Sequence, residues 1–482
     1  MEELSRSVSE LKQTFNTGRT RDVEWRKAQL KGIIKLLDEN ELQIFQALER
    51  DLGKHPVEAY RDEIGVIKKS ARFTLSSIDK WVAPTKKQVP LLFYPSKGVV
   101  MPEPLGIVLI FSSWNFPFTL SLDPLIGAVS AGNTVVLKPS ELAAESSAFL
   151  SKTIPLYLDC KAIKIIEGGV EVAEKLLQQK WDKIFYTGNA RVARIVMSAA
   201  SKHLTPITLE LGGKCPAIFG SLSDGDMKVA IKRIASGKWG PCSGQACVGI
   251  DYILVEHQHA SKLIDLLKKT IKKFYGENMG SLKNLCKIVN KHHFNRLHNL
   301  LEDPAVAASI VYGGSLDEQN LFIEPTILLD PPVDAAIMEE EIFGPFLPII
   351  TLDDIHESIE FINSREKPLT IYAFTKDESF KKQILAETSS GSVTFNDTFV
   401  LNACDNLPFG GVGGSGFGRY HGKYSFDTFS HEKAVLERTF YFELEGRHPP
   451  WNDFKLQFIR LAYNYDYFGL VLLLLGLKRK FT

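Results

Sequence analysis

Between residues 105 and 209, short apolar runs alternate with helical stretches, and this alternation constrains the fold more than any other feature of the chain. Helix-like stretches such as 120–131 and 191–202 separate the runs. Strands joined by helices build βαβ units with a parallel sheet, and continuously apolar strands are typical of burial on both faces. The pattern predicts an α/β domain of the dinucleotide-binding type. Its strands are expected at 105–111, 134–137, 163–166, 183–186 and 207–209.

A second alternating region runs from 211 to about 395, with a helix expected at 260–275. Its strands are expected at 253–255, 347–351, 370–374 and 392–396. Residues 1–80 carry apolar side chains at helical spacing and predict a run of helices. Two segments, 82–102 and 399–438, fit neither alternating block.

Cys247 and Glu210 are the residues whose chemistry stands out. Cys247 follows a Gly-Gln-Ala turn, and Glu210 precedes Gly212 and Gly213, 37 residues upstream. A thiol can attack an electrophilic carbon, and a carboxylate can activate the water that releases the product. Taken singly, each residue has a plainer interpretation, because a lone cysteine is more often a small core hydrophobe.

The words around both residues resemble the aldehyde dehydrogenase superfamily, and they recur in order along the chain. They are 111–117 (FSSWNFP), 136–141 (VLKPSE), 185–189 (FYTGN), 209–214 (LELGGK), 244–247 (GQAC), 341–345 (EIFGP) and 407–411 (LPFGG). The text from Asn406 to Phe429 resembles class 3 of that superfamily. Residues 187–194 and 449–451 look most like plant members.

The resemblance implies an aldehyde dehydrogenase-like α/β fold in three parts. It places a Rossmann-type NAD-binding domain at 1–81 and 103–210 and an α/β catalytic domain at 211–396. A small β oligomerisation segment is implied at 82–102 and 397–440, followed by a C-terminal tail at 441–482. The family pattern also implies a homodimer.

The resemblance further implies oxidation of aldehydes to carboxylic acids. Cys247 would be the nucleophile, forming a thiohemiacetal and then a thioester, and Glu210 would be the base for hydrolysis. The side chain of Asn115 and the backbone N–H of Cys247 would stabilise the oxyanion. Class 3 resemblance and abundant aromatic residues suggest medium- or long-chain aliphatic and aromatic aldehydes, with detoxification as the role.

The cofactor residues are expected at strand ends. Lys138 and Glu141 follow the strand at 134–137, where an acid accepts hydrogen bonds from ribose hydroxyls and repels a 2′-phosphate. This favours NAD, with NADP as the alternative. Thr187 and Gly188 precede a helix whose N-terminus can face phosphate.

Three further features bear on the cofactor site. Glu341 and Phe343 match the family residues that hold the nicotinamide ribose and ring. Residues 411–416 satisfy GxGxxG but lack the preceding strand and following helix, so we reject them as the dinucleotide fingerprint. Those glycines would instead let backbone run beside the active site or a subunit contact.

Two conspicuous side chains receive plainer roles. Lys214 is expected to organise the turn that carries Glu210. His421 is expected to be structural or to face a partner subunit, because no proton transfer is assigned to it.

Charge and cysteine usage exclude several function classes. The 57 basic and 57 acidic residues balance, so nucleic acid is not an expected partner. The six cysteines, which include Cys242, lack zinc-site spacing, so we expect no metal and six reduced thiols. The first residues lack the order of a secretory signal, so a cytoplasmic location is expected.

The apolar run 468–477 is ten residues long, about half of what a spanning helix needs, and Lys478, Arg479 and Lys480 follow it. It is expected either to pack on protein or to make a peripheral membrane contact through 468–480.

Two other function classes stay open at this point. One is a non-catalytic structural or binding homologue, and the other is a cysteine hydrolase that needs no dinucleotide. A requirement for NAD in aldehyde turnover discriminates them.

Overall fold

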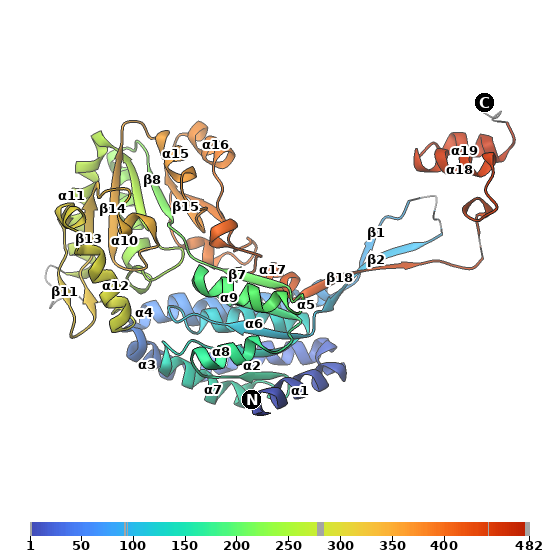
Figure 1. The fold of residues 1–482 in the computed structure, drawn as a ribbon, viewed down its shortest axis with the longest axis horizontal. Coiled ribbons are helices and arrows are strands. Elements are labelled where there is room, and N and C mark those ends of the chain that lie inside the picture. The colour runs from blue at the N-terminus through green and yellow to red at the C-terminus, as the bar shows by residue number, and fades with distance from the viewer. Residues whose placement is uncertain (1, 91–92, 94, 277–283, 442, 478–482) are drawn as a thin grey trace. The chain divides into compact units, whose positions relative to one another are not determined.

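The computed structural model describes residues 2–90, 93, 95–276, 284–441 and 443–477 of the 482-residue chain. The chain divides into two compact units (Figure 1). The first unit comprises Met1–Trp81 and Pro104–His431, and the second comprises Val82–Glu103 and Glu432–Thr482.

The first unit opens with the run of helices that the apolar spacing predicts. Leu30, Ile33 and Leu37 are fully buried, and Asp22 caps the second helix by accepting a hydrogen bond from Glu24 N. A short π-helical turn, η2 (Tyr60–Ile64), interrupts the run. The helices are α1 (Glu2–Asn16), α2 (Val23–Glu39), α3 (Glu41–Leu52), α4 (Pro56–Ala59) and α5 (Gly65–Val82).

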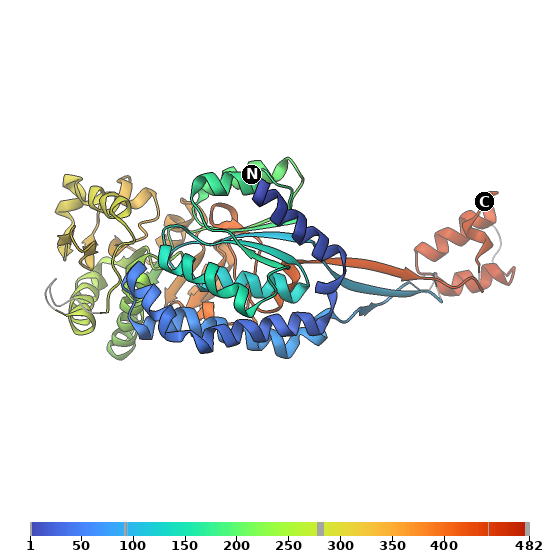
Figure 2. The same ribbon diagram turned by 90° about the horizontal axis from the view of Figure 1, so that it is seen from below.

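A six-stranded sheet follows, with helices on both of its faces (Figures 1 and 2). Its strands are β3 (Ile107–Phe111), β4 (Thr134–Lys138), β5 (Ile163–Ile165), β6 (Lys183–Thr187), β7 (Ile207–Glu210) and β17 (Gly416–Phe417). Its flanking helices are α6 (Thr119–Ala131), α7 (Ala144–Tyr157), α8 (Val170–Leu177), α9 (Ala190–Ser201) and α17 (Lys423–Thr428). The bounds of β3 to β7 agree with the predicted strands, and β3, β4 and β6 are buried along their whole length. Strand β17 is not among the predicted strands.

The strand order of this sheet locates a crevice. The order is β17-β7-β6-β3-β4-β5, so β3 has β4 on one side and β6 on the other. All neighbours are parallel except β17, which runs antiparallel to β7. Ligands of open parallel sheets bind at the carboxyl ends of the strands, where the order reverses. That point lies between β3 and β6.

The second sheet of the first unit has the order β10-β13-β14-β9-β8-β15-β16. Only β10 is antiparallel to its neighbour. The strands are β8 (Pro216–Phe219), β9 (Tyr252–Glu256), β10 (Ile310–Tyr312), β13 (Thr326–Leu329), β14 (Phe346–Leu352), β15 (Thr370–Phe374) and β16 (Ser392–Phe395). A separate hairpin joins β11 (Leu316–Asp317) to β12 (Phe322–Ile323).

Helices cover both faces of this second sheet. Helices α10 (Asp224–Trp239) and α11 (His257–Tyr275) share one buried cluster with it. The opposite face packs on α12 (Lys291–Leu301), α13 (Pro304–Ala308), α14 (Ala336–Glu339), α15 (Glu357–Asn363) and α16 (Glu378–Glu387). The predicted α/β class is therefore confirmed in both halves of the unit.

Residues 397–431 differ in placement from the sequence-based division, which groups 397–440 with 82–102. In the structure they belong to the first unit. Gly416 pairs with Glu210 in β7, and the rings of Tyr420 and Phe185 meet edge to face with centroids 5.3 Å apart. These long-range contacts attach the segment to the first sheet.

The second unit holds a three-stranded sheet with the order β1-β2-β18. Its strands are β1 (Thr85–Lys87), β2 (Lys97–Pro104) and β18 (Ser430–Glu437). Two helices, α18 (Asp453–Tyr463) and α19 (Tyr467–Leu474), pack together through Phe458, Ala462, Leu470 and Leu473. No helix of the described residues has both the length and the apolarity that crossing a membrane requires.

Candidate active site

Two strand ends of the first sheet and one loop of the second contribute Thr187, Glu210 and Cys247 to the wall of a cavity, whose lining does not include Asn115. Glu210 is the last residue of β7, and Thr187 is the last residue of β6. Asn115 lies in the loop between β3 and α6. Cys247 lies between η4 (Cys242–Gly244) and β9.

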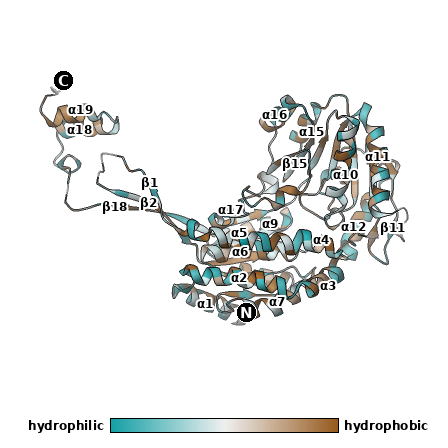
Figure 3. Cartoon of the chain, turned by 180° about the vertical axis from the view of Figure 1, so that it is seen from behind, coloured by the Kyte–Doolittle hydropathy of each residue, from teal (hydrophilic) through white to brown (hydrophobic). Residues whose placement is uncertain are grey.

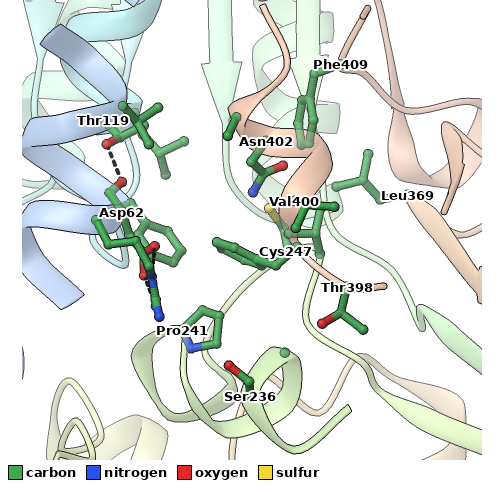
Figure 4. A pocket seen from close by; sticks show the side chains of 18 of the residues that line it. Asp62, Thr119, Ser236, Pro241, Cys247, Leu369, Thr398, Val400, Asn402 and Phe409 are labelled. Atoms are coloured by element: carbon green, nitrogen blue, oxygen red, sulfur yellow. Dashed lines mark hydrogen bonds and ion pairs between the residues drawn. The ribbon is translucent and has the colours of Figure 1, made fainter. Parts of the chain in front are cut away.

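The cavity has a volume of about 570 Å³ (Figure 4). Cys247, Glu210 and Thr187 all contribute to its wall. In Figure 4 the thiol of Cys247 lies among Leu369, Val400 and Phe409. Other apolar lining residues are Phe116, Leu120, Leu211, Val248, Phe274, Phe399 and Tyr420.

The Cys247 thiol is partly buried and resists ionisation. Burial raises its pKa to about 12, and the nearby carboxylates of Glu341 and Glu210 add to the rise. The backbone N–H groups of Cys247 and Val248 act in the opposite direction. Since the thiolate is the nucleophile, reactivity requires that the carboxylates be neutral or moved, or that positive charge arrive.

Within the described part of the chain, the carboxylate of Glu210 is buried without hydrogen bonds that would offset its loss of hydration. Its side chain is 4% exposed, and neither carboxyl oxygen has a hydrogen-bond partner among the described residues. Burial raises its pKa well above the ordinary value. A carboxylate in this state takes up a proton more readily than an exposed one, which suits a general base.

Asn115 connects the two loops of the site. Its amide Nδ2 donates to the backbone carbonyl of Gln245 at 2.9 Å, two residues before Cys247. The second hydrogen on Nδ2 is left for another acceptor. Gln245 is itself buried, and its Nε2 donates to the carbonyls of Cys242 and Lys287, each at 3.0 Å. The loop that carries the nucleophile is therefore fixed on both sides.

The residues expected to contact the pyrophosphate of the cofactor, Thr187 and Gly188, lie beside hydrogen-bond donors that a phosphate could accept from. The hydroxyl of Thr187 is buried and has no partner among the described residues. Gly188 donates its N–H to the carbonyl of Glu210 at 3.1 Å, and a Cβ at this position would stand 2.3 Å from the Tyr186 hydroxyl. Asn189 caps α9 by accepting from Val192 N at 2.9 Å. An unpartnered donor beside a helix N-terminus fits a phosphate-bearing ligand.

Lys138 and Glu141 lie together at the end of the neighbouring strand β4. The two side chains are joined by a 2.8 Å ion pair. Lys138 is buried, whereas the Glu141 side chain is 41% exposed. A carboxylate that stays accessible here fits a ribose, since it accepts hydrogen bonds from two adjacent hydroxyls.

Glu341 and Phe343 lie in the loop between α14 and β14 and do not line the cavity. Burial raises the pKa of Glu341 to about 8, and the Asp251 carboxylate adds to the rise. Its carboxylate lies against Gly212, where an added Cβ would stand 2.1 Å from Oε2. The ring of Phe343 meets Trp114 edge to face with centroids 5.4 Å apart. The structure thus brings Glu341 to the Glu210 turn and Phe343 to the Asn115 loop.

The glycines of 411–416 run beside the active site. Leu211 N donates to the Ser415 carbonyl at 3.1 Å, and Gly416 has a φ of +118°. A Cβ on Gly416 would stand 2.0 Å from the carbonyl of Leu209, so backbone approaches backbone at this point. Lys214 donates to the carbonyls of Ile337 and Glu340, at 2.8 and 3.0 Å, and thereby anchors the Glu210 turn.

His421 lines the cavity, a position that its sequence context does not indicate. It stacks on Phe409 with centroids 5.0 Å apart and has Nε2 3.5 Å from Asp123 Oδ2. Burial lowers its pKa to about 4. It is neutral at physiological pH and has an apolar packing role.

Sequence reasoning misses three buried charged side chains near the cavity, namely Lys54, Glu58 and Glu63. They lie in a segment whose many charged residues are typical of the exposed surface of a helix. The signal that points to them is the position of Pro56, which starts a new helix just after Gly53 ends α3.

Comparison with known proteins agrees with this geometry. Residues 1–435 match the model of the aldehyde dehydrogenase family. The chain is 60% identical to aldehyde dehydrogenase family 3 member F1 of Arabidopsis thaliana, covering 99% of both chains. It is 49% identical to family 3 member H1 of the same plant, covering 98% of both.

A solved structure gives the same result. The substrate-bound AldH of Staphylococcus aureus matches with a TM-score of 0.92 and 42% identity, over 95% of this chain and 99% of that one. The resemblance inferred from the seven sequence words is therefore confirmed. The chain belongs to family 3 of the aldehyde dehydrogenase family, the enzymes that oxidise aldehydes to carboxylic acids.

Proposed function

We propose that the chain oxidises medium- or long-chain aliphatic aldehydes, or aromatic aldehydes, and that NAD is its preferred cofactor. One observation carries the proposal. Cys247 and Glu210 line a single cavity of about 570 Å³ whose wall is mostly apolar by area. The other charged residues on the same wall are Arg61, Asp62, Lys232, Arg233 and Asp397. An apolar cavity with few polar groups at one end suits a substrate with a hydrocarbon body and one reactive carbon.

Cys247 would begin the reaction by attack on the aldehyde carbon. The sulfur–carbon bond forms, the carbonyl electron pair moves to oxygen, and the thiol proton leaves to solvent water, so that Glu210 keeps its negative charge for the later hydrolysis. The oxyanion then takes hydrogen bonds from Asn115 Nδ2 and the backbone N–H of Cys247. Each donor of this kind typically lowers the activation barrier by about 3 kcal/mol.

The groups that would hold NAD are those at the strand ends. Glu141 would accept from the adenosine ribose hydroxyls, and Thr187, with the N-terminus of α9, would face the pyrophosphate. Glu341 and Phe343 would hold the nicotinamide ribose and ring. When bound, the nicotinamide supplies the hydride acceptor, and the carbon on Cys247 is left as a thioester.

Glu210 would then act on water. With no partner for either carboxyl oxygen among the described residues, it is free to accept a proton from a water molecule near the thioester. The water oxygen adds to the acyl carbon, the carbon–sulfur bond breaks, and the carboxylic acid leaves. An intact base of this type favours hydrolysis over transfer to another thiol.

NADH formation tests the whole proposal. The purified protein is mixed with a C6–C12 series of alkanals and benzaldehyde, with NAD, NADP or no dinucleotide. We expect NADH to form with kcat/KM rising as the chain lengthens, and Cys247→Ala to form none while still binding NAD. Aldehyde loss without a dinucleotide would contradict the proposal and favour a hydrolase.

We further propose that the chain forms a homodimer through the sheet β1-β2-β18. Residues 431–437 of β18 are exposed, which leaves an extended surface available for pairing. Light scattering of the whole protein tests this, and a monomer at micromolar concentration would contradict it. A cytoplasmic location stays a prediction from the sequence.

The tail offers a further surface, visible as hydrophobic helices in Figure 3. Phe468, Leu474 and Leu475 are 74%, 61% and 66% exposed. We propose that this surface makes a peripheral membrane contact. Residues 478–480, the basic end of the expected segment, lie outside the described part of the chain. Deletion of 455–482 should reduce recovery with membranes, and unchanged recovery would exclude the contact.

A further inference from the structure

A buried cluster of three charged side chains lies next to both loops of the active site. Lys54 follows α3, Glu58 lies in α4, and Glu63 lies in the π turn η2. The side chains of Lys54 and Glu63 are 0% exposed, and Lys54 Nζ lies 2.6 Å from Glu63 Oε1. Replacing a buried ion pair by apolar side chains is often neutral or stabilising. Stability alone therefore gives no reason for these charges.

Glu63 holds the start of α6 with its second carboxyl oxygen. Oε2 accepts the backbone N–H of Phe118 at 3.0 Å and that of Thr119 at 2.9 Å. Helix α6 has no side-chain cap from its own N-cap residue, Phe118, so Glu63 takes that role from another element. A carboxylate is also favourable at the positive end of a helix dipole. Glu63 thus fixes the position at which the Asn115 loop enters α6.

Two neighbouring contacts reinforce this attachment. The ammonium of Lys54 lies 4.2 Å from the centroid of the Phe116 ring, one residue after Asn115. The hydroxyl of Thr119 donates to the backbone carbonyl of Asp62 at 2.8 Å, a bond drawn in Figure 4. The π turn, a feature often found at functional sites, places both Asp62 and Glu63 against the loop.

Glu58 makes the corresponding contact with the other loop. Its Oε1 accepts the backbone N–H of Cys242 at 2.7 Å. Cys242 opens the nucleophile loop, with a φ of +49° that a cysteine adopts only when its surroundings impose it. The ten residues 54–63 therefore contact the oxyanion loop and the nucleophile loop at once.

We propose that Glu63, paired with Lys54, is a positioning residue that sets the place of Asn115 relative to Cys247. The inference rests on the proposed function, in which Asn115 stabilises the oxyanion. Asn115 already meets the nucleophile loop at the Gln245 carbonyl. Glu63 fixes the opposite end of the same loop, so that the amide cannot swing away as charge develops on the substrate oxygen.

A displaced donor loses much of its effect. A misplacement of about 1 Å in a catalytic constellation can lower the rate by about 10²-fold. Because Asn115 acts on the transition state, the loss should fall on kcat, with the KM for aldehyde and the Kd for NAD close to wild type.

Two variants separate positioning from simple loss of stability. Glu63→Gln keeps an acceptor oxygen but removes the partner of Lys54, whereas Lys54→Met/Glu63→Gln removes both charges of the pair and leaves Glu58 as the remaining acid of the cluster. We expect kcat to fall about 10- to 100-fold in both. Arg26→Met is the matched control, because Arg26 is a buried cation that donates to the Ser130 carbonyl at the other end of α6. It should lower Tm and leave kcat within about twofold.

A double-mutant cycle with Asn115→Ala gives the decisive readout. If Glu63 acts through Asn115, Lys54→Met/Glu63→Gln should lower kcat by less than about threefold in the Asn115→Ala background. Equal losses in both backgrounds would overturn the inference while the proposed function stood. Wild-type protein that forms no NADH would instead overturn the proposed function.

Crystal structures of wild type and the double variant test the inference without activity. The bond from Asn115 Nδ2 to the Gln245 carbonyl should be lost or lengthened in the variant. An unmoved loop would overturn the inference.

Discussion

The carboxylate of Glu341 lies against the α-carbon of Gly212, leaving no room for even a methyl group between them. Gly212→Ala should push Glu341 out of place and raise the KM for NAD about tenfold, since Glu341 is proposed to hold the nicotinamide ribose. Gly213→Ala is the control, because a Cβ there has its nearest neighbour at 3.5 Å. Initial rates over a range of NAD concentrations measure the effect. Equal KM values for the two variants would contradict it.

Glu210→Gln should separate acylation from hydrolysis. The amide cannot take a proton from water, so a thioester on Cys247 should accumulate after one burst of NADH. Rapid-quench kinetics should give a burst near one equivalent, and intact-protein mass spectrometry should show the added acyl mass. A linear time course without a burst would assign deacylation to another group.

Glu141→Gln should weaken the discrimination against NADP. The substitution removes the negative charge that repels a 2′-phosphate and leaves Lys138 free to attract it. The ratio of kcat/KM for NAD to that for NADP should fall about tenfold. Glu145→Gln provides the control, since Glu145 is a more distant acid in α7, paired with Arg50. A shift of the same size in that variant would point to a general charge effect.

Glu341→Gln should make Cys247 ionise more readily. Burial is the main cause of the raised thiol pKa, and the Glu341 carboxylate is the next. Because the pKa of Glu341 is about 8, its charge opposes the thiolate mainly above that pH. Iodoacetamide labelling of Cys247 without cofactor should therefore be faster in the variant, with a difference that grows between pH 7 and 9. Identical pH–rate profiles would exclude the carboxylate as a cause.

Asp123→Asn should stabilise the fold at neutral pH. Burial raises the pKa of Asp123 to about 6, so the folded wild type loses stability as pH rises from about 4 through 6. An asparagine carries no such penalty and still accepts the hydrogen bond from Ser70. The variant should gain about 1 to 3 kcal/mol over wild type at pH 8 and little at pH 4. Urea unfolding at both pH values measures this, and a constant difference would contradict it.

The five parallel strands of the first sheet could be predicted from the sequence almost to the residue, and so could β9, β14, β15 and β16 of the second, whereas β8 and β13 are not among the predicted strands. The predicted strands are apolar runs between turn residues, and such runs have few alternatives to burial between helices. Cys247, Glu210 and Thr187 could likewise be predicted to meet, because the family words mark their positions and the structure places all three on one cavity wall.

Contacts between distant segments could not be predicted from the sequence. The pairing of Gly416 with Glu210 attaches 397–431 to the first unit, and no local pattern encodes that pairing. His421 lines the cavity for the same reason. Lys54 and Glu63 look like ordinary surface charges, because burial of an ion pair depends on what packs over it.

The proposed role of Glu210 sets catalysis against folding stability at this position. A buried acid without hydrogen bonds is a defect from the standpoint of folding, and a leucine or methionine there would relieve it. Variants selected only for heat resistance are therefore expected to lose this glutamate early. A raised Tm does not indicate retained catalytic activity in this enzyme.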